Sequence, residues 1–260
     1  MPIRRGFIDT PNGQIHFREL GSGPPLVLLH EVARSSDGFS EVLPLLAQRS
    51  RCLAMDVPGY GDSYHPAAYP GIEGYARSVI DFLDALGIER TDLLGFHTGA
   101  SIAAETAARY PERIAKLVVC GLPDVTDEER VKKIGGLHAT VPDAEFRYLS
   151  ELGPNLVHFA ERYWGTDYAH RQGIDFLKAI PNTHWGHQAV YEQRVRERIP
   201  EISAPTLLFC ASGDAFIRFQ PDLAALFADV QTAVIAESEK FPLVNQPERS
   251  ASLIRAFLDG

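Results

Sequence analysis

The sequence predicts an α/β protein with a mostly parallel, doubly wound sheet and a block of helices inserted late in the chain. Short apolar runs alternate with amphipathic stretches over the first 121 residues, as expected for strands connected by helices. From about residue 123 to 200 this alternation stops, and only helical and loop patterns follow. Strand patterns then return, so the middle block is expected to be an insertion in one sheet.

The first elements are expected to be a β-hairpin and two buried strands. Two β-type runs within residues 6–20 are separated by Pro11-Asn12-Gly13, a turn signal. Residues 26–29 and 51–56 are short apolar runs, typical of strands that are buried on both faces. Between them, residues 38–48 have apolar side chains at helical spacing and predict a helix.

Two further helix and strand units follow. Residues 72–86 predict an amphipathic helix, and Gly87 is placed to terminate it. Residues 91–97 predict a strand that leads through a turn into an alanine-rich helix over residues 100–110. Residues 116–121 predict the next strand.

The end of the chain completes the sheet. Strands are expected at residues 206–211 and 231–238, and a final helix over 249–260. We therefore divide the chain into a core, residues 1–122 and 201–260, and a helical cap, residues 123–200.

Composition narrows the class of protein. A net charge of −9 argues against a nucleic-acid partner, because phosphate binding needs clustered Lys and Arg. No run approaches the roughly 20 apolar residues that span a bilayer, and the N-terminus lacks the apolar run of a signal peptide. We expect a cytoplasmic protein with no membrane partner. The sequence is compatible with a homo-oligomer and does not determine the oligomeric state.

Two motifs lie where the strand pattern meets a turn. GFHTG at residues 95–99 stands between a strand and the alanine-rich helix, and DVPGYGDS at residues 56–63 follows the preceding strand. GFHTG resembles the nucleophile elbow of α/β hydrolases, and DVPGYGDS, which precedes it in the chain, resembles their Asp-x-Pro-Gly-x-Gly-x-Ser loop. The resemblance covers essentially the whole chain and implies the α/β-hydrolase fold with an inserted helical cap.

The resemblance assigns roles by position. His97 falls on the nucleophile, Asp214 on the acid, and Lys240 on the catalytic histidine of the family. His30 and Glu31 fall on the His-Gly pair that begins the oxyanion loop. The chain therefore departs from the family at three positions, with His97 for Ser, Cys or Asp, Lys240 for His, and Glu31 for Gly.

These departures disfavour ordinary ester or amide hydrolysis, which needs an activated nucleophile and donors aimed at the oxyanion. Glu31 is expected to place negative charge beside the oxyanion, which is the wrong sign. His97 is expected to act as a general base, or less favourably as a covalent nucleophile. We expect Lys240 to pair with Asp214, Glu31 or both, because buried charges need partners.

Other residues are expected to form a substrate cavity. The strand before Glu31 should deliver it to the carboxyl edge of the sheet, where ligands bind in α/β folds. Arg34, in the same loop, either contacts a polar substrate or forms an exposed turn. The expected substrate-binding residues are His30, Val32, Phe96, Thr98, Asp124, His184, Trp185 and His187.

Four of these positions have alternative interpretations. Asp124 is either an alternative acid or a surface carboxylate. His184 and His187 flank Trp185 in a pattern that fits a cavity ceiling, with packing between cap and core as the alternative. Metal binding by the two histidines lacks a third ligand, so no metal is expected.

The expected function is therefore an enzyme, a hydrolase or lyase without metal or organic cofactor, that acts on a small organic molecule between cap and core. The alternative is a catalytically inactive ligand-binding or interaction protein on the same scaffold. Loss of both the nucleophile and the base fits that alternative as well.

Overall fold

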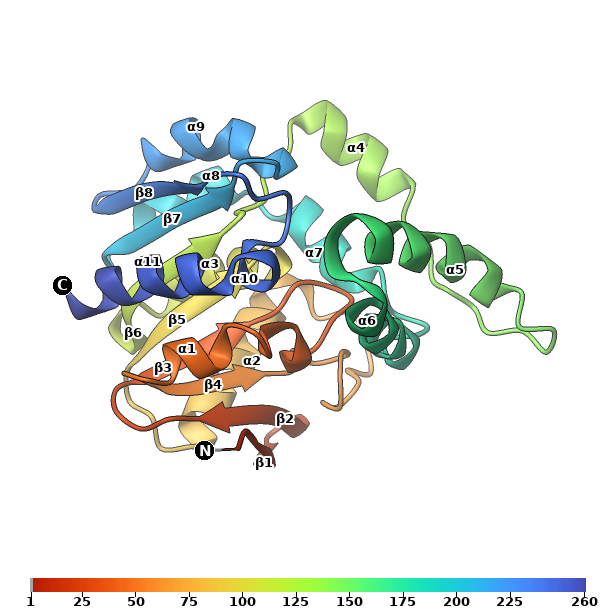
Figure 1. Ribbon diagram of the computed structural model, residues 1–260, viewed down its shortest axis with the longest axis horizontal. Helices are drawn as coiled ribbons and strands as arrows, with labels where there is room; N and C mark the ends of the chain where they lie inside the picture. Colours follow the sequence, from red (N-terminus) through yellow and green to blue (C-terminus); the bar gives the residue numbers. More distant parts are fainter. Residues whose placement is uncertain (1) are drawn as a thin grey trace.

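The computed structural model describes residues 2–260, apart from the side chains of Glu151, Leu152, Asn155, Phe159, Tyr163 and Trp164. An eight-stranded sheet lies at its centre in the order β1-β2-β4-β3-β5-β6-β7-β8 (Figure 1). β1 is antiparallel to β2, and β2 to β4, whereas the remaining neighbours are parallel. The predicted mostly parallel α/β sheet is confirmed.

The strands match the apolar runs of the sequence. The central ones are buried because helices cover both faces of the sheet, and the first two form the predicted hairpin. Their bounds are β1 Arg4–Thr10, β2 Gly13–Leu20, β3 Pro25–Leu29, β4 Arg51–Met55, β5 Thr91–Phe96, β6 Ile114–Cys120, β7 Thr206–Ala211 and β8 Val230–Ile235.

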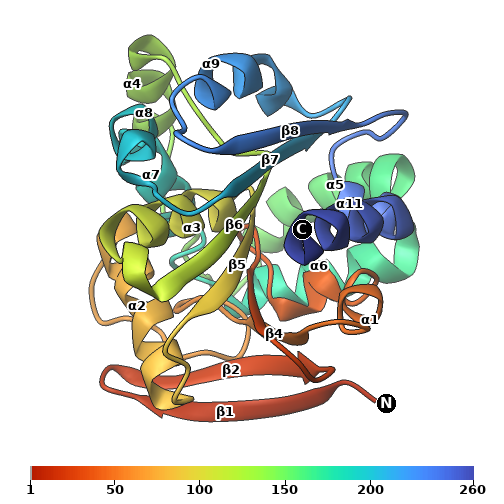
Figure 2. The same ribbon diagram turned by 90° about the vertical axis from the view of Figure 1, so that its left-hand side faces the viewer.

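Helices form a layer on each face of the sheet. α1 (Leu43–Leu46) and α11 (Pro247–Asp259) cover one face, and α2 (Gly71–Ala85) and α3 (Thr98–Arg109) cover the other (Figure 2). Each layer closes its own cluster of buried apolar side chains. Short helices α9 (Gln220–Ala224) and α10 (Pro242–Asn245) follow β7 and β8.

The predicted helix over residues 38–48 is wrong in extent. The structure has a 3-10 turn, η1, at Ser36–Phe39, and then the four-residue α1. Pro44 stands in the first turn of α1, where proline is tolerated because that N–H needs no partner. Farther into a helix it would remove a hydrogen bond, so one continuous helix cannot pass through it.

The chain between β6 and β7, residues 121–205, is helical and is called the β6–β7 segment below. No strand occurs in it among the described residues. Its helices are α4 Asp127–Gly135, α5 Tyr148–Phe159, η3 Ala160–Trp164, α6 Thr166–Lys178, α7 Trp185–Glu192 and α8 Val195–Arg198, followed by the 3-10 turn η4 Ile199–Glu201. Helices α4, α5 and α6 lie on the right in Figure 1, at one end of the sheet, whereas α8 contacts α3.

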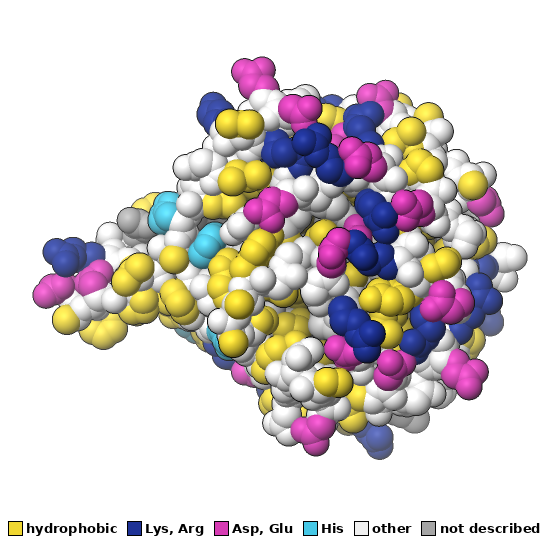
Figure 3. Space-filling view, turned by 180° about the vertical axis from the view of Figure 1, so that it is seen from behind, with side chains coloured by type: hydrophobic (Ala, Val, Ile, Leu, Met, Phe, Trp, Pro, Cys, Tyr) yellow, Lys and Arg dark blue, Asp and Glu magenta, His cyan; other side chains and the backbone are white. Residues whose placement is uncertain are grey.

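The surface carries charges of both signs. On the face in Figure 3, Lys and Arg side chains lie beside Asp and Glu rather than in one basic field. In the described part of the chain, no helix is both long and apolar enough to cross a bilayer. Cys52, Cys120 and Cys210 are buried free thiols.

Candidate active site

His97 occupies the sharp turn between β5 and α3. Its φ of 47° lies in the left-handed region, which residues other than glycine rarely adopt. Gly95 and Gly99 make this turn possible. A Cβ on Gly95 would stand 2.2 Å from the Gly99 carbonyl oxygen, and a Cβ on Gly99 would stand 2.0 Å from the Leu29 carbonyl oxygen. The GFHTG motif therefore fixes the imidazole at the carboxyl end of the central strands.

His97 and Asp214, which are 117 residues apart in the chain, are hydrogen-bonded: Nε2 of His97 lies 2.5 Å from Oδ2 of Asp214. Asp214 follows β7 and is buried, and its Oδ1 accepts the Phe216 N–H. Burial raises the pKa of Asp214, but the hydrogen bond and charge of His97, the Phe216 N–H and the Lys240 charge together lower it. The structure brings the expected acid and the elbow residue together.

An ionised Asp214 determines which nitrogen of a neutral His97 carries the proton. The carboxylate accepts the Nε2–H, which leaves the lone pair on Nδ1. The Cδ2–Nε2 edge faces Gly121, where a Cβ would stand 2.5 Å from Cδ2. Phe96 stacks on the imidazole at 4.1 Å between ring centroids. Nδ1 has no hydrogen-bond partner among the described residues and is available to a bound molecule.

A cavity of about 540 Å³ lies above this imidazole. Val32, His97 and Thr98 line it from the core, and His187 and Tyr191 of α7 line it from the β6–β7 segment. Its volume fits a small organic molecule, since ligand sites typically measure about 300–1,000 Å³.

Two backbone N–H groups are available at the cavity. Neither the Val32 N–H nor the Thr98 N–H donates a hydrogen bond to a described residue, and both residues line the cavity. Thr98 is the first residue of α3, where N–H groups lack intrahelical acceptors and carry partial positive charge. An N–H after the elbow and one from the loop after the first parallel strand form the oxyanion hole of this fold.

The negative charge expected of Glu31 beside the oxyanion has a counter-charge in the structure. Glu31 lines the cavity, but its Oε1 lies 3.6 Å from the Arg34 guanidinium, which compensates its charge. Arg34 is itself buried and lines the cavity, so it is not the exposed turn that the sequence left open. One of the three objections to acyl chemistry is therefore weakened.

The prediction that Lys240 forms an ion pair with Asp214 or Glu31 is wrong. The Lys240 ammonium lies within 4 Å of no described carboxylate and stands 5.4 Å from the centroid of the Phe241 ring. Asp214 is already bonded to His97, and Glu31 faces Arg34. Lys240 still lines the cavity and acts on Asp214 through its charge.

Several expected binding residues lie at the cavity. Val32, Thr98 and Asp124 line it, and Asp124 pairs with Arg196 at 2.7 Å rather than lying on an open surface. His187 lines both this cavity and an adjoining pocket of about 240 Å³, which His184 also lines.

The remaining three lie elsewhere. His30 has a structural role, because Nδ1 bonds the Glu31 carbonyl oxygen at 2.8 Å and Nε2 accepts the Val57 N–H at 3.0 Å. Phe96 supports His97 from beneath and is not part of the cavity wall. Trp185 packs against Tyr69 at 6.0 Å between ring centroids, outside the cavity.

The side chain of His187 is exposed at the cavity wall, and many protein atoms around it reduce its access to bulk water. This desolvation, followed by the charges of Lys240, Lys133 and His97, lowers its pKa to about 4. It is therefore neutral at pH 7. Within the described residues, His184 and His187 belong to no group of three potential metal ligands.

Sequence reasoning did not single out Lys133, Tyr191, Phe216 or Gly121. Gly121 ends the 116–121 run directly after a strand, a position that could have drawn attention to it. Lys133 and Tyr191 belong to helices of the β6–β7 segment, and no local pattern marks them as cavity residues.

Comparisons with known proteins show the family and the fold of this chain. The sequence model of the family described as alpha/beta hydrolase fold matches residues 24–247. An uncharacterized protein of Mycobacterium tuberculosis is 30% identical over 190 residues, which are 72% of this chain and 52% of that protein. Bifunctional epoxide hydrolase 2 of Mus musculus is 35% identical over 128 residues, which are 46% of this chain and 23% of that protein.

A solved structure matches over the full length. The crystal structure of E-2-(acetamidomethylene)succinate hydrolase has a TM-score of 0.82 and 17% identity, covering 100% of both chains. At that identity the likeness concerns the fold. The present chain spans about half the length, or less, of the curated relatives it matches.

Proposed function

Because this chain belongs to the alpha/beta hydrolase fold family, we propose that it is an enzyme in which His97 acts as a general base on a small organic substrate. The reaction is a hydrolysis or an elimination of the lyase type. One observation carries the proposal: the Asp214 carboxylate holds Nε2 of His97 at 2.5 Å, and Nδ1 remains unbonded in the described structure.

In a hydrolysis, Nδ1 of His97 takes a proton from water while the water oxygen bonds to the substrate carbonyl carbon. The oxyanion accepts hydrogen bonds from the Val32 and Thr98 N–H groups. When the carbonyl re-forms, the bond to the leaving group breaks, and the imidazolium returns its proton to that group. Asp214 stabilises the imidazolium throughout and stays ionised.

In an elimination, the same nitrogen removes a proton from a carbon next to a carbonyl group. The two N–H groups hold the resulting enolate oxygen. A leaving group on the next carbon then departs with its electron pair and takes the proton from His97. This route needs no hydroxyl nucleophile at the centre of the elbow, where the chain has His97.

A panel of small esters, lactones, epoxides, amides and β-keto acids tests the proposal on wild type, His97→Ala and His170→Ala. His170 is exposed on α6 and lines no described cavity, so its variant is the matched control. We expect His97→Ala to lower kcat/KM by about 10²–10⁴-fold on whichever substrate reacts, and His170→Ala to have no effect.

Two outcomes would contradict it. Turnover that persists in His97→Ala would remove the imidazole from the reaction. Tight binding of a panel compound without turnover by the wild type would support the alternative, an inactive ligand-binding protein on this scaffold.

The cap boundaries at residues 123 and 200 and the cytoplasmic location remain predictions.

A further inference from the structure

In the cavity wall, every carboxylate has a cationic partner, but not every cation has an anionic one. All three carboxylates of the wall have a cationic partner: Glu31 has Arg34, Asp124 has Arg196 and Glu129 has Arg218. The wall has two more cations, Lys133 and Lys240, and neither lies within 4 Å of a described carboxylate. The cavity of a protein with net charge −9 thus contains two ammonium groups without an anionic partner in the described structure.

The two lysines come from opposite sides of the cavity. Lys133 is on α4 of the β6–β7 segment, and Lys240 is in the core loop between β8 and α10. The Lys133 ammonium stands 5.1 Å from the centroid of Tyr191, and this ring stacks on His187 at 6.1 Å. The Lys240 ammonium stands 5.4 Å from the centroid of Phe241, which lies 6.0 Å from the His97 ring.

Aromatic faces stabilise an ammonium only modestly, by about 0.5–1 kcal/mol at exposed sites. They hold each lysine at the wall without neutralising it. Desolvation lowers the pKa of His187, and the charges of Lys240 and Lys133 lower it further. Both lysines line the same cavity as this imidazole. A neutral imidazole adds a hydrogen-bonding group there without adding repulsion between cations.

We propose that the cavity takes a small organic acid, whose carboxylate is held in the field of Lys133 and Lys240 while its apolar part contacts the surrounding wall. This rests on the proposed function, because it names the substrate class of the same site. The apolar contacts come from side chains such as Val32, Phe176 and Val190.

Isothermal titration calorimetry with matched probes tests the inference without turnover. Benzoate and glutarate are compared with benzamide and glutaramide, their neutral isosteres, on the full-length protein. We expect the wild type to bind the carboxylates at least about tenfold more tightly than the amides, and added salt to reduce that difference. Lys240→Gln and Lys133→Gln should each weaken carboxylate binding several-fold and leave amide binding unchanged.

Lys132→Gln is the matched control, because Lys132 is adjacent to Lys133 on α4 and is exposed like it, but does not line the cavity. Equal affinities for acids and amides, or no carboxylate binding at roughly 10 mM, would overturn the inference. So would an equal loss in Lys132→Gln, which would indicate a general charge effect. His97→Ala should keep carboxylate binding, so a catalytic failure and a failure of anion binding give different results.

Discussion

His16 and His97 each bond a buried aspartate. Nδ1 of His16 lies 2.8 Å from Oδ2 of Asp56, and Nε2 of His97 lies 2.5 Å from Oδ2 of Asp214. Distance and burial alone do not distinguish the two pairs. Their surroundings do, and these indicate which histidine is suited to chemistry.

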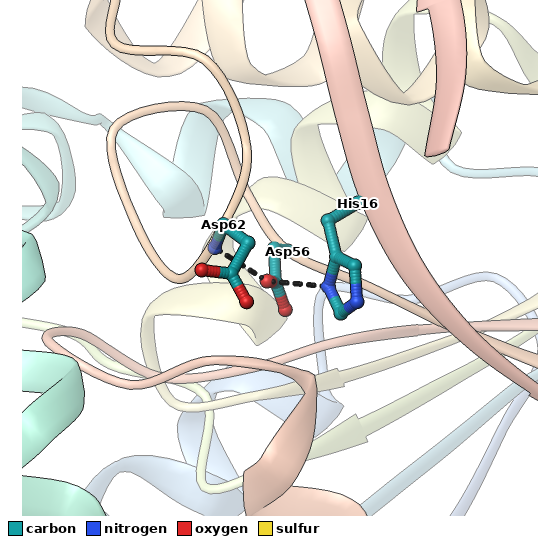
Figure 4. Close-up of side chains that lie close together, drawn as sticks. All are labelled: His16, Asp56 and Asp62. Atoms are coloured by element: carbon teal, nitrogen blue, oxygen red, sulfur yellow. Dashed lines mark hydrogen bonds and ion pairs between the residues drawn. The ribbon is translucent and has the colours of Figure 1, made fainter. Parts of the chain in front are cut away.

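Asp56 is saturated by donors. Its Oδ1 accepts the Ser36 N–H at 2.6 Å. Its Oδ2 accepts the Asp62 N–H at 2.8 Å and is also bonded to His16 (Figure 4). Burial raises the pKa of Asp56, but these bonds and the nearby His30 outweigh it and lower the pKa to about 2. A Cβ on Gly61 would stand 2.1 Å from Oδ2, so the DVPGYGDS loop is wrapped around this carboxylate.

The pair of His16 and Asp56 therefore joins β2 to two loops and lines no described cavity. Asp214 has one backbone donor, Phe216, besides His97, and His97 presents its second nitrogen at the cavity. A buried histidine–aspartate pair thus becomes a candidate for catalysis only when the remaining ring nitrogen can reach a substrate.

Asparagine substitutions should separate the pairs most strongly. In Asp214→Asn, the amide can donate to Nε2, which moves the His97 proton to Nδ1 and removes the base. We expect kcat/KM to fall by about 10³-fold or more, by analogy with wrong-tautomer variants of catalytic triads. Asp56→Asn should instead lower the free energy of unfolding by about 4 kcal/mol, because a buried hydrogen-bonded charge is lost.

Urea denaturation and kinetics on the same preparations check both halves of this prediction. Residual folded Asp56→Asn should keep most of its activity. The comparison fails if Asp56→Asn is the variant that loses catalysis while it keeps full stability.

Gly121→Ala should disturb the His97 pair from below. The glycine has a φ of +62°, and its new Cβ would stand 2.8 Å from Nε2 of His97 and 3.0 Å from Oδ2 of Asp214. Strain and overpacking should lower the free energy of unfolding by about 3 kcal/mol and reduce turnover. Gly135→Ala on α4, where nothing lies within 4 Å of the added methyl group, should be neutral or slightly stabilising in the same chemical denaturation assay. Equal effects of the two substitutions would argue against this contact.

The smallest expected effect is the contribution of Asp56 to the fall in the free energy of unfolding at acid pH. The folded-state pKa of Asp56 is about 2, below the 3.8 of an ordinary aspartate, so the folded state binds fewer protons than the unfolded chain between these values. The free energy of unfolding should fall as the pH is lowered from about 4 to 2, with about 2 kcal/mol due to Asp56. Urea titrations at several pH values should show a smaller fall in Asp56→Asn, and an identical fall would assign the loss to other carboxyl groups.

Much of the fold and part of the site could be predicted from the sequence. Apolar periodicity marked the strands, since a strand buried on both faces must be apolar along its length. The glycines around His97 marked the elbow, since only they permit that approach of backbones. Pro44 indicates a shorter helix than residues 38–48, although the apolar side chains of that range have helical spacing throughout.

Local pattern determined where His97, Glu31 and Lys240 stand on the sheet, because the carboxyl ends of parallel strands meet at one edge. Only the tertiary structure decided their partners. Glu31 faces Arg34, three residues along a buried turn, and Lys240 lies against an aromatic ring. Lys133 lies on a helix more than a hundred residues before Lys240 in the chain. The reason is physical: the pairing of a long charged side chain depends on which groups compete for it in space, and that competition has no local signature in the sequence.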